Sequence, residues 1–131
     1  MAELVDRLKL IAIVEDDPDL ATLFCEVLPL FGQWRLHLIS DGQMAKNELP
    51  SMAADLILLD LGLPGLDGVS LYKILRGHSL TKHTPIVVIT GSRDWELHRM
   101  GLQAGILLPK PFNIDELVGI IQALLSDEGA S

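Results

Sequence analysis

The side chains in this sequence that could do chemistry stand where apolar runs stop. Glu15 and Asp16 follow the run LIAIV, and Asp60 follows LILL. Thr90 follows IVVI, and Lys110 comes directly after ILLP. Short continuous apolar runs are typical of buried strands. Each of these polar groups is therefore expected at a strand end.

Carboxylates that meet at one sheet edge repel one another, and proton uptake or a bound cation relieves that repulsion. Glu15, Asp16 and Asp60 offer only oxygen ligands, which favour Mg²⁺ over zinc. Asp60 could attack phosphorus as a nucleophile, with the positive charge of Lys110 and the hydroxyl of Thr90 on the phosphoryl oxygens. Any one of these residues alone is equally a helix cap or a solvated surface group. The prediction rests on their occurrence together.

Strand and helix patterns alternate along the chain. The sequence predicts strands at 9–15, 34–39, 55–60, 85–90 and 106–109, and helices at 18–31, 41–49, 68–77, 93–103 and 113–126. The third and fourth strands are almost entirely apolar, as expected for strands that helices cover on both faces. The pattern indicates an α/β fold, a (βα)5 chain with a doubly wound parallel sheet, whose ligand site lies beyond the carboxyl ends of the strands.

Composition excludes several classes of protein. The chain has 131 residues and a net charge of −8, which disfavours direct nucleic acid binding and anionic membranes. The single Cys25 cannot form an internal disulfide, and we find neither a transmembrane run nor a signal segment. A cytoplasmic location is the expectation. The acidic segment after the first strand also lacks the glycines that a dinucleotide site would need.

Over about 8–126 the sequence resembles the receiver domains of two-component response regulators. Glu15-Asp16 stands at the acidic metal-binding pair of that family, and Asp60 stands at its phosphoacceptor. Thr90 matches the switch hydroxyl, and Lys110-Pro111 matches the lysine and the cis-proline that follows it. Residues 1–7 are then an N-terminal extension, and 127–131 are a C-terminal tail.

The turn after the acceptor also fits this family. Pro64 and Asp67-Gly68 match its xPxxDG pattern, and Gly62 would lend its main-chain carbonyl to the metal. The resemblance implies a flavodoxin-like sheet with strand order 2-1-3-4-5. It also implies Mg²⁺-dependent transfer of a phosphoryl group to Asp60 from a sensor histidine kinase or a phosphotransfer protein.

The output implied by the resemblance is a changed protein-interaction surface. This surface would act on a downstream protein target or on an effector domain missing from this sequence. Such a domain catalyses only its own phosphorylation and slow dephosphorylation, so it is not an enzyme acting on other substrates.

Three features near the fifth strand depart from the family pattern. The stretch from Gly105 to Lys110 is shorter than usual, which could displace Lys110 slightly. Leu107 stands where an aromatic residue is usual. Pro109 removes a backbone donor, so that end of the fifth strand should be an edge or already lie outside the hydrogen-bonded ladder. These departures leave open an alternative, an interaction module whose switch does not depend on phosphorylation. A hydrolase of the haloacid dehalogenase type is disfavoured, because Gly62 occupies the place of its second acid.

Overall fold

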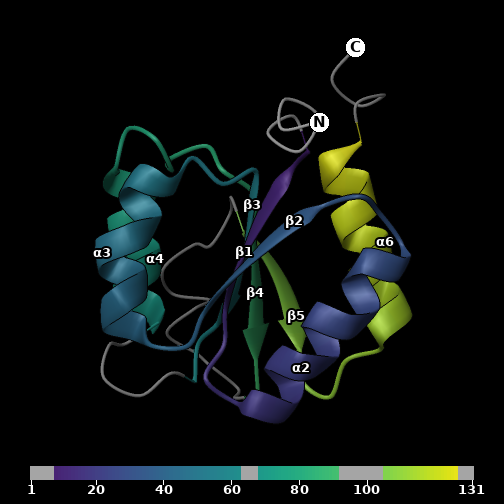
Figure 1. The fold of residues 1–131 in the computed structure, drawn as a ribbon. Coiled ribbons are helices and arrows are strands. Elements are labelled where there is room, and N and C mark those ends of the chain that lie inside the picture. Colours follow the sequence, from purple (N-terminus) through teal and green to yellow (C-terminus); the bar gives the residue numbers. More distant parts are fainter. Residues whose placement is uncertain (1–7, 63–67, 92–104, 127–131) are drawn as a thin grey trace.

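The structure, a computed structural model, describes residues 8–62, 68–91 and 105–126. Its centre is a five-stranded parallel sheet with the order β2-β1-β3-β4-β5, as predicted (Figure 1). The strands are β1 (Leu10–Val14), β2 (Arg35–Ile39), β3 (Leu56–Asp60), β4 (Ile86–Thr90) and β5 (Gly105–Pro109). All strands point the same way, so their carboxyl ends share one edge.

Helices lie on both faces of the sheet. They are α2 (Pro18–Val27), the short 3₁₀ helix η1 (Leu28–Leu30), α3 (Gly42–Met52), α4 (Gly68–Gly77) and α6 (Ile114–Leu125). In Figure 1, α3 and α4 cover one face, and α2 and α6 cover the other. The predicted helix at 93–103, the extension 1–7 and the tail 127–131 lie outside the described residues.

Strand residues alternate between two separate cores, because successive side chains of a strand point to opposite faces. In β1, Ile11 and Ile13 pack with Phe24 on the side of α2 and α6. Ala12 and Val14 pack on the side of α3 and α4. All residues of β3 and β4 are buried, which explains why both segments are continuous apolar runs up to their last residue.

The first helix is shorter than the sequence predicted. It ends at Val27 instead of Phe31 and continues as the tighter turn η1, in which the Phe31 N–H donates to the Leu28 carbonyl at 3.1 Å. Pro29 is the physical reason, because it has no N–H to continue the α-helical hydrogen-bond pattern.

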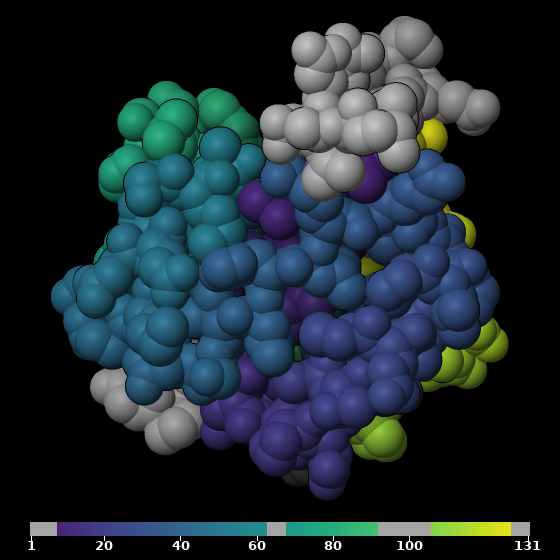
Figure 2. All heavy atoms as spheres, in the orientation of Figure 1, coloured from purple at the N-terminus to yellow at the C-terminus, as the bar shows by residue number. Residues whose placement is uncertain are grey.

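In the space-filling view of Figure 2, the side chains of α3 lie on one side of the edge strand β2, and those of α2 and η1 lie on the other side. As an edge strand, β2 leaves Leu38 41% exposed. Among the described residues, none of the helices combines the length and the apolar character needed to cross a bilayer.

Candidate functional site

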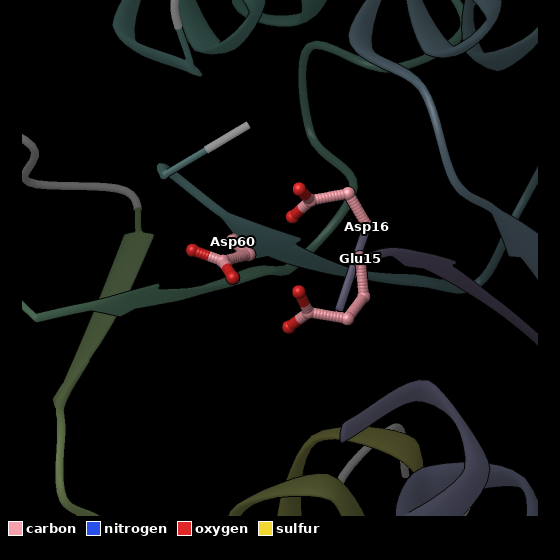
Figure 3. A group of neighbouring side chains, drawn as sticks. All are labelled: Glu15, Asp16 and Asp60. Carbon is pink, nitrogen blue, oxygen red and sulfur yellow. The ribbon is translucent and has the colours of Figure 1, made fainter. Parts of the chain in front are cut away.

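Three carboxyl groups converge at the carboxyl-end edge of the sheet. Glu15 and Asp16 follow β1, and Asp60 is the last residue of β3. Because β1 and β3 are neighbours in register, the two strand ends deliver these side chains to one place. Their carboxylate oxygens lie within 4.8 Å of one another, and the side chains of Glu15 and Asp16 point toward Asp60 (Figure 3). We call these three residues the acidic cluster.

Asp60 is buried and held at both oxygens. Its Oδ2 lies 2.9 Å from the Lys110 Nζ, and its Oδ1 accepts a hydrogen bond from the Gly62 N–H at 2.8 Å. The side chain of Asp60 is only 5% exposed. Burial alone would raise the pKa of Asp60, but the neighbouring Glu15 carboxyl group, the hydrogen bonds with Gly62 and Lys110 and the charge of Lys110 outweigh it and lower the pKa. Asp60 is thus ionised, as a nucleophilic carboxylate must be.

Glu15 is even more buried, at 1% exposure, and its carboxyl group is only half satisfied. Its Oε2 accepts from the Asp17 N–H at 3.1 Å, whereas Oε1 has no hydrogen-bond partner within 8–62, 68–91 and 105–126. Desolvation, followed by the neighbouring Asp60 carboxylate, raises the pKa of Glu15 to about 8. Without a cation, this position thus favours the protonated form of Glu15.

Lys110 is fixed at its main chain and reaches the acidic cluster with its side chain. Its N–H donates to the Thr90 carbonyl at 2.8 Å, which extends the pairing of β4 with the edge strand β5 beyond Pro109. Desolvation would lower the pKa of Lys110, but the hydrogen bond to Asp60 and the surrounding acids raise it. The short stretch before Lys110 does not keep its ammonium from Asp60.

Thr90 and Gly91 complete this edge of the sheet. Thr90 ends β4, the strand next to Asp60, and is 8% exposed. Gly91 leaves space beside Lys110, since a Cβ atom there would lie 3.5 Å from the Lys110 Cδ. Pro64 and Asp67 of the predicted turn motif lie outside the described residues.

Asp17 has a role that our reading of the sequence missed. Its Oδ1 accepts from the Asp19 N–H at 2.9 Å and caps α2, while its own N–H binds Glu15. An Asp directly before a proline that opens a helix is a recognisable N-cap signal. Asp17 thus connects the start of α2 to the acidic cluster.

The acidic cluster fits a hard divalent cation. It presents carboxylate oxygens only, which are the protein ligands that Mg²⁺ prefers. The Oε1 atom of Glu15 is buried and has no hydrogen-bond partner among the residues that the structure describes, so a bound cation could satisfy it. Cation binding would also relieve the repulsion that raises the pKa of Glu15.

An apolar groove of about 450 Å³ opens beside Lys110. It lies between the first turns of α2 and the segment that leads into α6, and its apolar lining includes Leu20, Leu23, Phe112 and Ile114. The charged edge of the sheet is therefore bordered by a surface that an apolar group could contact.

Comparison with known sequences identifies relatives. The family model described as response regulator receiver domain matches residues 11–122. The DNA-binding response regulator MtrA of Mycolicibacterium smegmatis is 37% identical over 117 residues, which are 88% of this chain and 50% of that protein. The transcriptional regulatory protein CpxR of Escherichia coli is 39% identical over 118 residues, which are 88% of this chain and 48% of that protein. The chain thus spans about half the length of these curated relatives.

Two solved structures show the same fold. One is the receiver domain of a sensor histidine kinase from Pseudomonas aeruginosa, with a magnesium ion coordinated in the active site cleft. It is 33% identical, has a TM-score of 0.77, and the match covers 89% of this chain and 97% of that one. The other is the response regulator TrrA of Thermotoga maritima in complex with Mg(2+)-BeF, with 27% identity, a TM-score of 0.78, and coverage of 90% and 100%. Since the family model spans most of the sequence and the sheet order and acidic edge agree with it, the chain belongs to the response regulator receiver domain family.

Proposed function

We propose that this domain accepts a phosphoryl group on Asp60 and signals through the resulting change in its protein-interaction surface. The observation that carries the proposal is the environment of the Asp60 carboxylate. It is buried and ionised, bound to Lys110 at 2.9 Å, and clustered with Glu15 and Asp16. A carboxylate held in this way is a preorganised nucleophile with positive charge already beside it.

The transfer forms one bond and breaks another. An oxygen of Asp60 bonds to phosphorus, and the bond between phosphorus and a histidine nitrogen of the donor breaks. The electron pair of that bond returns to the imidazole, and Asp60 becomes an acyl phosphate. Its negative charge then lies on the phosphoryl oxygens, so we propose that Lys110 and the Thr90 hydroxyl stabilise it there.

Mg²⁺ is the cofactor in this proposal. The side chains of Glu15, Asp16 and Asp60 and the main-chain carbonyl of Gly62 would hold it. When bound, it supplies charge neutralisation between the acidic cluster and the incoming phosphoryl group. Two observations support this assignment: the buried Oε1 of Glu15, which has no hydrogen-bond partner in the described part of the chain, and a ligand set made of oxygen atoms.

The proposed donor of the phosphoryl group is a sensor histidine kinase or a phosphotransfer protein. The phosphorylated domain would then act on a protein target or on a further domain. MtrA is named as DNA-binding, and this chain matches half of it. The net charge of −8 opposes direct contact with DNA, so we assign DNA binding to no part of this chain.

The test is the intact mass of the protein after incubation with acetyl phosphate and Mg²⁺. We expect a gain of one phosphoryl group that disappears in Asp60→Asn and with excess chelator. Asp55→Asn is the matched control, because Asp55 binds the Leu10 N–H through its side chain at 2.7 Å, at the opposite end of β3. A wild-type protein without the adduct would refute the proposal.

Leu107 supports a second candidate, an interaction module that does not switch by phosphorylation. It occupies the position where the family carries an aromatic residue, and it packs against the core on the side of α3 and α4. If Asp60 takes up no phosphoryl group although the protein is folded, this candidate becomes the better account.

A further inference from the structure

The edge strand β2 carries main-chain hydrogen-bonding groups on its free side. On its other side it pairs with β1, where the Arg35 N–H donates to the Lys9 carbonyl at 2.8 Å. Since the main-chain groups of successive strand residues point to opposite sides, Leu36 and Leu38 direct their N–H and C=O groups away from β1. No strand of the described residues pairs with β2 there. The free edge of β2 therefore offers two donors and two acceptors to another strand.

Exposed apolar side chains gather around this edge. On the side of α2, Leu36 packs against the core, and Leu38, two residues further along the strand, is 41% exposed. On the side of α3, Glu48 Oε1 lies 3.3 Å from His37 Nε2, so the helix face that also carries Met44 lies beside β2. All but one of the exposed large hydrophobic residues in the described parts of the chain lie in β2 or in the neighbouring segments α2, η1 with its capping residue, and α3 (Figure 2): Leu23, Leu30, Phe31, Leu38 and Met44. A strand that pairs with β2 would therefore bury apolar surface as well as main chain.

The two ends of β2 carry opposite charges. Arg35 opens the strand, and its Nε atom has no hydrogen-bond partner among the described residues. Asp41 follows the strand, is exposed, and caps α3 through its Oδ1 atom. Two antiparallel copies of β2 would place Arg35 of each near Asp41 of the other, whereas parallel copies would bring like charges together. The charges thus favour an antiparallel second copy as the occupant of this edge.

We propose that the free edge of β2 binds the same edge of a second copy of this chain, which gives a symmetric dimer with an antiparallel β2–β2 pair. A two-fold axis at His37 sets Leu36 opposite Leu38 of the second copy, and these residues exchange both of their main-chain hydrogen bonds. The axis repeats this exchange, so two such pairs form. Because β2 and β5 are opposite edges of the sheet, the dimer does not depend on phosphorylation of Asp60.

The experiment is sedimentation velocity on the full, unphosphorylated chain at concentrations up to about 1 mM. An ionic strength of about 0.15 M screens the repulsion between two chains of net charge −8. We expect self-association that Leu38→Lys weakens at least about tenfold, because a lysine puts a charge into the edge at both symmetric positions. Leu80→Lys is the matched control, since Leu80 is an exposed leucine between α4 and β4 and the same charge is added there. It should associate as the wild type does.

Amide hydrogen exchange locates the contact in the wild type, without any substitution. The Leu36 and Leu38 amides should exchange more slowly as the protein concentration rises. The His37 amide, which faces β1, should not change with concentration. This readout also serves if Leu38→Lys does not fold.

A double-mutant cycle tests the orientation of the two strands. Arg35→Gln and Asp41→Asn each remove one charge, and Asn preserves the cap of α3. Each should weaken the dimer, and the double variant should be no weaker than the weaker single variant, because both remove the same ion pair. Fully additive effects would overturn the antiparallel pair.

A wild-type protein that stays monomeric at about 1 mM would overturn the inference. A dimer that persists in the folded Leu38→Lys variant would overturn it as well, because its contact then lies elsewhere on the molecule. The same holds for a dimer whose Leu36 and Leu38 amides gain no protection. None of these results bears on the phosphorylation of Asp60.

Discussion

Glu15→Gln should make the metal-free protein more stable at alkaline pH. The pKa of Glu15 is raised from 4.5 to about 8, chiefly by desolvation. Between these values the folded protein binds a proton that the unfolded chain has lost, so the stability of the wild type falls as pH rises. Gln has nearly the shape of the protonated acid and does not titrate, so the substitution should remove this pH-dependent loss of stability.

The magnitude follows from the pKa values. One pKa unit corresponds to about 1.4 kcal/mol, so the advantage of Glu15→Gln should grow by up to that amount per pH unit above pH 4.5. It should level off near pH 8 at an upper limit of about 5 kcal/mol. Near pH 4.5 and below, the two proteins should be nearly equal in stability.

Urea denaturation in the presence of chelator, from pH 5 to pH 9, measures this difference. Glu26→Gln is the control, since Glu26 is an exposed residue of α2 and the same change of side chain is made there outside the acidic cluster. Adding Mg²⁺ should shrink the advantage of Glu15→Gln, because the wild-type carboxylate then has a cation to bind. A pH-independent difference between wild type and Glu15→Gln would refute the reasoning about Glu15.

Two further predictions concern the elements that support the site. Gly68→Ala should destabilise the protein by about 1–3 kcal/mol in urea denaturation, because the new Cβ would lie 2.8 Å from the Leu61 Cα. Gly77→Ala, at the other end of α4, meets nothing within 4 Å and should change stability far less, so equal effects would contradict this account. Asp41→Ala should cost about 1 kcal/mol, because the Asp41 side chain accepts the N–H groups of Gln43 and Met44 as the N-cap of α3. An unchanged urea midpoint would argue against that cap.

The sequence predicted the central strands well for a simple physical reason. Every residue of β3 and β4 is buried, so a run of apolar residues is enough to identify both segments as strands. The start of α6 could be predicted equally well, because Asn113, a residue type typical of helix N-caps, precedes it. In the structure its side chain accepts from the Asp115 N–H at 2.8 Å. Strong local signals of this kind need no knowledge of the rest of the chain.

Other features depended on contacts that a pattern cannot show. The helix that begins at Pro18 stops early because of Pro29, whereas α3 runs through Pro50 to Met52. The convergence of Glu15, Asp16 and Asp60 was predicted from topology, but the missing partner of Glu15 Oε1 could be found only in three dimensions.

The Lys110–Asp60 ion pair also has a consequence for folding. Its two residues are 50 positions apart, and Glu15 directly follows yet another strand, β1. Parallel pairing of such distant segments is entropically slow to form, so we expect this ion pair to form after β3, β4 and β5 have assembled side by side. Divalent cation binding by the acidic cluster, which needs β1 and β3 already paired, would in the same way report in a refolding experiment that the middle of the sheet has formed. Cation binding by the acidic cluster can therefore be used to follow the assembly of the sheet during folding.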